Sequence, residues 1–193
     1  MSVSSVQFSS GHPPPALQLP SLFQRLQVSP RGGLCVQVGC SDLEVTLALT
    51  RLFDHLLALD TSSAALDAAR AGVVREGATN VDFELVQESH LEGVADEIAD
   101  AVVECEFLKR LQRREQLYSQ LAEFARVLRH RRHAYITVPL RSRRLTGRPL
   151  RRHSPIAVSE RQLAQALSRA GLIVYASDES ASPRELLLHL ERE

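Results

Sequence analysis

This sequence lacks an excess of charge of either sign, paired cysteines and long apolar runs. Its 23 basic and 23 acidic residues cancel, so no overall electric field draws the chain toward nucleic acid or an anionic membrane. The three cysteines are an odd number without a Cys-x-x-Cys pair, which argues against a disulfide framework and against a zinc site. The histidines are scattered, so no metal-ligand set is expected.

Nothing in the sequence is typical of a segment that crosses a membrane. No apolar run approaches the ~20 residues that a membrane-spanning helix needs. Residues 1–20 are rich in serine and proline, but they lack the basic start and apolar centre of a signal peptide. We therefore expect residues 1–20 to be a flexible leader, residues 21–193 to form one domain, and the protein to be cytoplasmic.

Glycine is scarce in the turn that follows the first apolar strand. The strand Val-Gln-Val (residues 36–38) runs into Gly39, and a second apolar strand ends at Asp60. In an open α/β sheet, such a glycine turn lets the backbone approach a nucleotide-type cofactor, and the acid accepts hydrogen bonds from the ribose hydroxyls. A dinucleotide-binding dehydrogenase needs Gly-x-Gly-x-x-Gly, and residues 39–44 supply only the first glycine. This departure argues against a dehydrogenase.

Apolar periodicity predicts strands that alternate with helices. Strands are predicted at residues 34–38, 55–59, 82–86, 100–104, 133–138, 172–176 and 185–190, and helices at residues 44–53, 62–76, 107–130 and 159–171. We expect one break in the third helix, near Arg113-Arg114. Only residues 177–184 separate the last two strands, which is too short for a parallel crossover. The predicted fold class is therefore α/β, a Rossmann-like three-layer sandwich with a seven-stranded, mostly parallel sheet and an antiparallel last strand.

With these elements in order, the sequence resembles the class I S-adenosylmethionine-dependent methyltransferases over roughly residues 22–190. Its segments are similar to the successive motifs of that family, at residues 36–41, 59–70, 80–88, 99–103, 124–139 and 163–174. Such motifs in the right order are together more specific than any one of them. The resemblance implies S-adenosylmethionine as the cofactor and a small-molecule or lipid-like methyl acceptor.

The resemblance also implies which residues hold the cofactor. Gly39 would let the backbone turn beneath the methionine part, Asp60 would bind the ribose hydroxyls, and Glu88 would lie near the adenine amino group. The full set of cofactor-binding candidates is Gln37, Gly39, Ser41, Asp60, Thr61, Glu88 and Ser89. Each principal candidate has a simpler interpretation. Gly39 could be a tight turn, Asp60 a helix cap and Glu88 a solvated loop carboxylate.

On the acceptor side, family members place residues that face the transferred methyl group at the end of the fourth strand. The substrate-side candidates are Glu104 and Glu106 at this end, together with Arg141 and Arg144 in an arginine-rich loop after the fifth strand. That loop could grip a phosphate, a carboxylate or RNA, although charged loops are usually just solvated. No catalytic residue is predicted, because methyl transfer from a sulfonium depends mainly on in-line positioning. Cys105 as a covalent nucleophile is disfavoured, since a small buried cysteine is more common.

Three departures from the family pattern leave the activity open. Gln37 replaces the usual acid that helps to hold the cofactor's amino group, and Ser41 and Leu43 stand where glycines often occur. The sequence is therefore compatible with a methyltransferase acting on a small molecule, with a methyltransferase-like binding or scaffold protein that has lost catalysis, and, less favoured, with an RNA methyltransferase. A further departure, Arg131-Arg132 in place of a common glycine pair, is expected to have structural consequences only.

Overall fold

The computed structural model describes residues 32–87, 90–140, 156–179 and 185–193. The predicted leader lies outside these ranges. So do four of the predicted site residues, Glu88, Ser89, Arg141 and Arg144.

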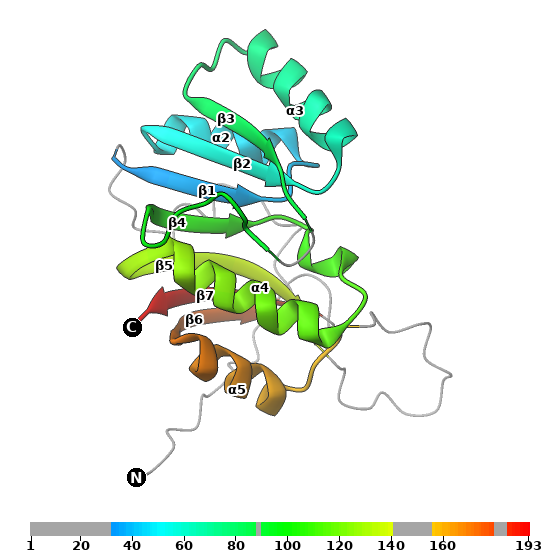
Figure 1. Ribbon diagram of the computed structural model, residues 1–193, viewed down its shortest axis with the longest axis vertical. Coiled ribbons are helices and arrows are strands. Elements are labelled where there is room, and N and C mark those ends of the chain that lie inside the picture. Colours follow the sequence, from blue (N-terminus) through cyan, green and yellow to red (C-terminus); the bar gives the residue numbers. More distant parts are fainter. Residues whose placement is uncertain (1–31, 88–89, 141–155, 180–184) are drawn as a thin grey trace.

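Strands and helices alternate through the described residues (Figure 1). The strands are β1 (Leu34–Val38), β2 (His55–Asp60), β3 (Val81–Leu85), β4 (Ala99–Glu104), β5 (Leu128–Pro139), β6 (Leu172–Glu179) and β7 (Glu185–Arg192). The helices are α2 (Leu43–Leu52), α3 (Ser63–Arg75), the short 3₁₀ helix η1 (Leu108–Arg110), α4 (Arg114–Val127) and α5 (Glu160–Ala170). All seven predicted strands form, most of them close to their predicted bounds, but β5 begins five residues earlier than predicted.

The strands make one seven-stranded sheet in the order β3-β2-β1-β4-β5-β7-β6. The pairs from β3 to β5 are parallel, and β7 runs antiparallel to both β5 and β6. This confirms the predicted fold class. The chain builds outward from β1 to β3 and then returns to place β4 on the other side of β1. The carboxyl ends of β1 and β4 therefore flank the crevice where open α/β sheets bind their ligands.

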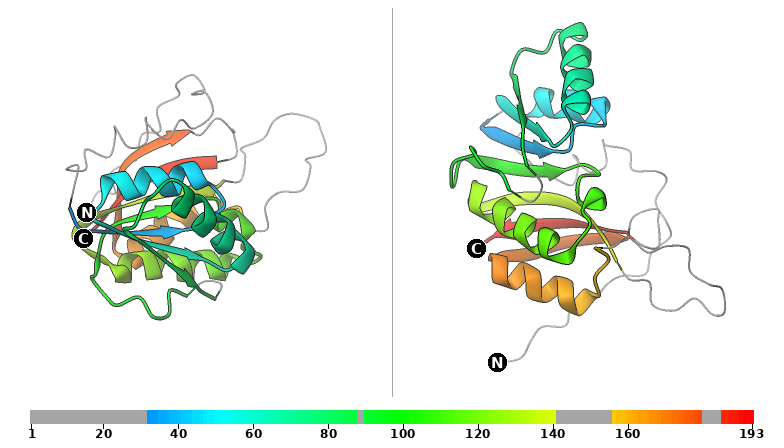
Figure 2. Two further views of the ribbon diagram at one scale, coloured as in Figure 1. Left: turned by 90° about the horizontal axis from the view of Figure 1, so that it is seen from above. Right: turned by 45° about the vertical axis from the view of Figure 1, so that its right-hand side comes forward.

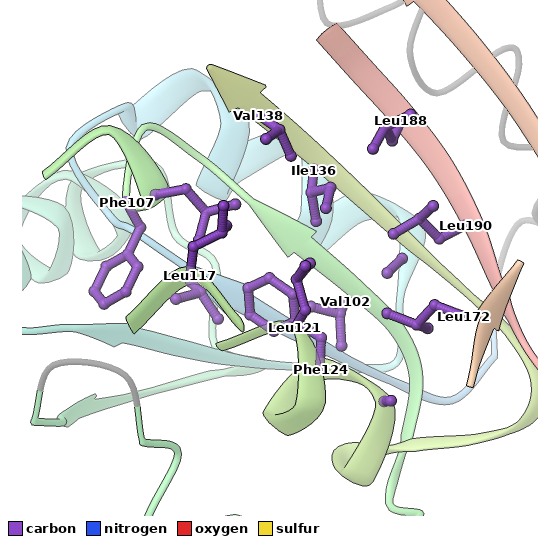
Figure 3. Packing of buried hydrophobic residues seen from close by; sticks show 14 of the residues in the cluster. Val102, Phe107, Leu117, Leu121, Phe124, Ile136, Val138, Leu172, Leu188 and Leu190 are labelled. Atoms are coloured by element: carbon purple, nitrogen blue, oxygen red, sulfur yellow. The ribbon is translucent and has the colours of Figure 1, made fainter. Parts of the chain in front are cut away.

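Helices cover both faces of the sheet, and each face has its own apolar core (Figure 2). On one face, α4 and α5 pack against residues such as Val102 and Ile136, with Phe124 fully buried among them (Figure 3). On the other face, α2 and α3 pack against β1, β2 and β4. Strands buried on both sides must be apolar on both sides, which explains the continuous apolar runs of β1, β2 and β4.

Polar side chains begin two of these helices as the sequence predicts. The Ser62 hydroxyl accepts from the backbone N–H of Ala65 at the start of α3. At the start of α5, Ser159 and Gln162 form a reciprocal capping box, and Gly171 ends that helix with φ +70°. Serine caps and glycine stops satisfy the free backbone groups at helix ends.

The prediction of one helix over residues 107–130 is only partly correct. The segment begins with η1, α4 starts at Arg114 as the expected break implies, and β5 already begins at Leu128. The first residues of β5 bulge, because Leu128 pairs with Ala99 but His133 pairs with Ala101. Within this bulge Arg131 adopts φ +56°, the left-handed conformation that glycine adopts more easily.

No helix in the described ranges is both long and apolar enough to cross a membrane. In the same residues, no group of three or more His, Cys, Asp and Glu side chains is arranged to hold a metal ion.

Candidate cofactor site

The site is built around the glycine turn at the end of β1. Gly39 has φ +97°, and its N–H donates to the carbonyl of Leu59 at 2.8 Å. On the other side, the N–H of Cys105 donates to the carbonyl of Val38 at 2.9 Å. A Cβ atom at position 39 would lie 2.1 Å from the carbonyl oxygen of Cys105. Only glycine therefore fits between the ends of β2 and β4.

Asp60, the last residue of β2, is fully buried beside this turn and accepts four hydrogen bonds. The backbone N–H of Cys40 donates to Oδ2 at 2.8 Å, and that of Ser62 donates to Oδ1 at 3.0 Å. The guanidinium of Arg110 donates to both oxygens, at 2.9 and 3.0 Å. A carboxylate offers about four lone-pair positions, so all of them are in use.

These contacts keep Asp60 ionised. Burial acts to raise the pKa of Asp60, but the hydrogen bonds from Arg110, Cys40 and Ser62 outweigh it, so the pKa lies below its ordinary value. The same pairing raises the pKa of Arg110. Asp60 is not the cap of α3, because Ser62 caps that helix. The Asp60 carboxylate instead joins the turn at Cys40, the start of α3 at Ser62 and the guanidinium of Arg110.

Sequence reasoning missed Arg110. It lies in η1, whose backbone is fixed by the buried side chains of Phe107, Leu108 and Leu111. The guanidinium carbon lies 5.3 Å from the centre of the Phe107 ring, and the side chain is 39% exposed. The signal available in the sequence was its position shortly after β4, because the carboxyl ends of parallel strands meet at one edge of the sheet.

Gln37 lies fully buried below the turn, on β1. Its Nε2 donates to the carbonyl of Gly39 at 2.9 Å, while its Oε1 is buried without a hydrogen-bond partner among the described residues. A buried polar oxygen without a partner is costly and rare in native proteins. A hydrogen-bond acceptor therefore remains available close to the turn. It lies at the position where the methyltransferases that the sequence resembles usually have an acid.

The other predicted cofactor residues lie on the same rim but make fewer contacts. Ser41 is exposed and Thr61 is half-buried. Asp42 caps α2, accepting from the backbone N–H groups of Glu44 and Val45. Leu43, which stands where the family often has a glycine, packs against Gly72: a Cβ atom at position 72 would lie 2.4 Å from Leu43 Cδ2. Leu43 thus fills the gap between α2 and α3.

Glu104 ends β4 and is almost fully buried. Its Oε1 accepts from the N–H of Leu108 at 2.8 Å, and its Oε2 accepts from the N–H of Thr137 at 2.9 Å. Burial raises the pKa of Glu104 to about 7; the backbone N–H donors lower it and the charge of Glu106 raises it. Glu104 thus connects the end of β4 to β5 and to η1.

Glu106 and Cys105 follow Glu104 on the rim. Glu106 adopts φ +60°, is exposed, and pairs with Lys109 at 2.6 Å between Oε1 and Nζ. Burial raises the pKa of the Cys105 thiol well above its ordinary value, and the neighbouring charge of Glu104 adds to this. A thiolate is the reactive form of cysteine, so this thiol is not activated as a nucleophile.

Comparison with known families shows which family contains this domain. Residues 36–136, more than half of the chain, match the model of a family described as the methyltransferase domain. The chain belongs to this family. The match begins two residues into β1 and ends within β5, so it includes the turn, Asp60, Glu104 and Arg110. The predicted family, and with it S-adenosylmethionine as the cofactor of that family, is confirmed.

Solved structures show the methyltransferase fold along almost the whole chain. A SAM-dependent methyltransferase from Aquifex aeolicus is 18% identical, with a TM-score of 0.68 over 90% of this chain and 89% of that one. An S-adenosylmethionine-dependent methyltransferase from Mesorhizobium loti is 16% identical, with a TM-score of 0.69 over 90% and 96%. The cyclase SpnF is 16% identical, with a TM-score of 0.72 over 90% and 79%. At these identities the similarity concerns the fold alone. The comparison with proteins of curated function gives no match.

The methyltransferase site fits S-adenosylmethionine at two points and conflicts with it at a third. The unpartnered Oε1 of Gln37 suits an ammonium donor, and the turn at Gly39 excludes any side chain. Asp60 is the residue expected to bind the ribose, but Arg110 takes both of its oxygens. The residues fit the cofactor when Arg110 leaves Asp60, because the carboxylate then has two free acceptor positions for a ribose diol.

Proposed function

We propose that this methyltransferase-family protein binds S-adenosylmethionine and transfers its methyl group to a small-molecule acceptor. The observation that carries the proposal is the placement of Asp60, which is buried and ionised beside the Gly39 turn at the switch point of the sheet. Two backbone N–H groups orient this carboxylate independently of Arg110. Such pre-orientation is what a binding carboxylate needs.

When bound, S-adenosylmethionine supplies a methyl group on a sulfonium, which needs no activation by the protein. The residues of this chain then have binding and positioning roles. Asp60 accepts hydrogen bonds from the ribose hydroxyls, and Gln37 Oε1 accepts one from the amino group of the cofactor. Ser41 and Thr61 border the same rim. Both oxygens of Glu104 accept hydrogen bonds from backbone N–H groups. This side chain therefore keeps the backbone of the rim in place instead of acting as a base. Positioning of this kind can supply most of a transfer reaction's acceleration.

The described part of the rim after β4 favours a small-molecule acceptor over a nucleic acid. Its basic side chains Lys109 and Arg110 already pair with Glu106 and Asp60, so they offer little free positive charge to the phosphates of a polyanion. The alternative, an RNA methyltransferase, depends on Arg141, Arg144 and the rest of their loop, which lie outside the described residues. A small acceptor needs no such surface.

One observation favours a second function, a methyltransferase-like binding protein without catalysis. The bidentate pair between Arg110 and Asp60 is a stable arrangement without any cofactor. Calorimetric titration of the purified protein with S-adenosylhomocysteine, the demethylated product, tests the first function. Saturable binding supports it. Absence of binding at high-micromolar ligand, for the protein and for a variant without Arg110, would leave the binding-protein interpretation.

A further inference from the structure

The contact between Arg110 and Asp60 joins residues 50 positions apart in the chain, from η1 to the end of β2. It has the parallel, two-bond geometry that gives arginine–carboxylate pairs their specificity. A ribose diol approaching the same carboxylate would need the same two oxygens. Arg110 and the ribose are therefore competitors for one acceptor.

We propose that Arg110 is a gate on the cofactor site, closed when it holds Asp60 and open when the ribose replaces it. The inference rests on the proposed function, because it assigns Asp60 to the ribose. In the closed state the carboxylate has a charged partner, and in the open state it has two neutral hydroxyl donors. Hydrogen bonds to the carboxylate are charge-assisted in both states, but only in the closed state is the partner also charged and bidentate, so the closed state competes effectively.

The surroundings of Arg110 allow the side chain to move without unfolding. Its backbone is fixed, since its N–H donates to the carbonyl of Phe107 and its carbonyl accepts from Gln112 Nε2. Its side chain is 39% exposed and has solvent on one side. Opening therefore requires a change of side-chain rotamer, while Cys40 and Ser62 keep the carboxylate in place.

A gate of this kind lowers the apparent affinity for cofactor by the fraction of molecules that are open. Arg110→Met keeps the apolar contact with Phe107 but removes both charged hydrogen bonds. We expect Arg110→Met to bind S-adenosylhomocysteine roughly tenfold more tightly than the unchanged protein, given the strength of hydrogen bonds to charged groups. Arg110→Lys, which offers a point charge instead of a fork, should lie between the two.

Arg70→Met is the matched control. Arg70 also lies over an aromatic ring, 5.4 Å from the centre of Phe83, and also contacts an aspartate, Asp67, at 3.4 Å. It lies on α3, where its partners are not part of the cofactor site. Its removal should leave the affinity for S-adenosylhomocysteine unchanged.

Two further readouts separate a gate from a structural role. Rising salt should weaken the partly exposed closed pair, and should therefore tighten ligand binding to the unchanged protein but not to Arg110→Met. Adenosine and 2′,3′-dideoxyadenosine should respond differently. Arg110→Met should improve the binding of adenosine, which has the diol, and leave that of the dideoxy compound unchanged.

The experiment is calorimetric titration of the full chain and these variants. Tighter binding to Arg110→Met, or binding that appears only in it, supports the gate. Unchanged or weaker binding, while the unchanged protein does bind, overturns the gate but leaves the proposed function standing. Equal improvement for both nucleosides shows that Arg110 only fills space, and overturns the competition. If neither protein binds S-adenosylhomocysteine, the proposed function fails and the gate fails with it.

Discussion

Two buried carboxylates end two strands of the same sheet, Asp60 on β2 and Glu104 on β4, yet their ionisation differs. The pKa of Asp60 lies below its ordinary value, whereas that of Glu104 is raised to about 7. Each accepts two backbone N–H groups and each is nearly inaccessible to solvent. Asp60 also has the guanidinium of Arg110. Burial alone therefore does not decide the charge of these carboxylates. A cationic partner does.

The two carboxylates are joined through η1. Glu104 accepts a hydrogen bond from the N–H of Leu108 at the start of this short helix. Arg110 at the end of the helix donates hydrogen bonds to Asp60. Glu104 at the end of β4 thus fixes the backbone from which Arg110 makes its charged contact to β2. The difference between the two acids suits two roles. Glu104 maintains the rim, and Asp60 is the carboxylate proposed to bind the ligand.

The largest expected effect comes from removing the carboxylate that has the charged partner. Asp60→Ala leaves the N–H groups of Cys40 and Ser62 without acceptors and Arg110 without its partner. We expect the free energy of unfolding to fall by about 3 kcal/mol, measured by urea denaturation, and binding of S-adenosylhomocysteine to be lost.

Asp67→Ala is the matched control for this change. Asp67 is exposed, and it makes one long contact with an arginine, 3.4 Å between its Oδ1 and Nη1 of Arg70. Its removal should change stability by less than about 0.5 kcal/mol. Similar losses for the two variants would show that the Asp60 contacts contribute no more than a surface pair.

A smaller effect, with a defined pH dependence, is expected at Glu104. Its ordinary pKa is 4.5 and its folded value is about 7, so between these values the folded protein holds a proton that the unfolded chain has released. Stability contributed by this group is full below 4.5 and is lost as pH rises through 7. From about pH 5 to about pH 8 we expect the unfolding free energy to fall by about 2 kcal/mol more in the unchanged protein than in Glu104→Gln.

The comparison between the two proteins isolates this group from other titrations. His189, for example, has its pKa lowered from 6.5 to about 4 by burial and by the neighbouring charge of His133, and gives a slope of opposite sign in both proteins. That slope cancels in the difference. Parallel pH profiles of unfolding would contradict the raised pKa of Glu104.

The smallest expected effect concerns the neighbour of Glu104. The charge of Glu106 raises the pKa of Glu104, behind the larger effect of burial. Glu106→Gln should therefore lower the pKa of Glu104, with a free energy below about 0.5 kcal/mol because Glu106 is exposed. Carboxyl-carbon NMR titration measures this directly. The pKa of Asp60 should stay unchanged, and a shift there instead would show that the two carboxylates are not independent.

Most of the fold could be predicted because strand periodicity and turn chemistry are local. The failure at the end of α4 has a physical reason. Leu121, Ala125 and Leu128 continue one apolar pattern, and all three are buried. Leu128 is nevertheless the first residue of β5. A buried residue satisfies the periodicity of a helix and of a strand equally, so the boundary depended on the bulge at Arg131.

The strands that carry the candidate site residues could be predicted, but the contacts of Asp60 could not. Gly39 and Asp60 can be recognised in the sequence because a turn after one strand and an acid at the end of the next are both local patterns. The pairing of Asp60 with Arg110 depends on the sheet order that brings residues 50 positions apart together. The contact of Leu43 with Gly72 has the same origin. No local pattern contains such contacts.

The most direct test of the gate follows Arg110 itself in the unchanged protein. Nitrogen-15 NMR of arginine side chains detects the restricted rotation and slow proton exchange of a guanidinium held in a bidentate pair. In the absence of ligand, Arg110 should show both. When S-adenosylhomocysteine saturates the site, the Arg110 signal should change to that of a solvated guanidinium, because the ribose has taken Asp60. A guanidinium that stays restricted while the ligand binds would contradict the account.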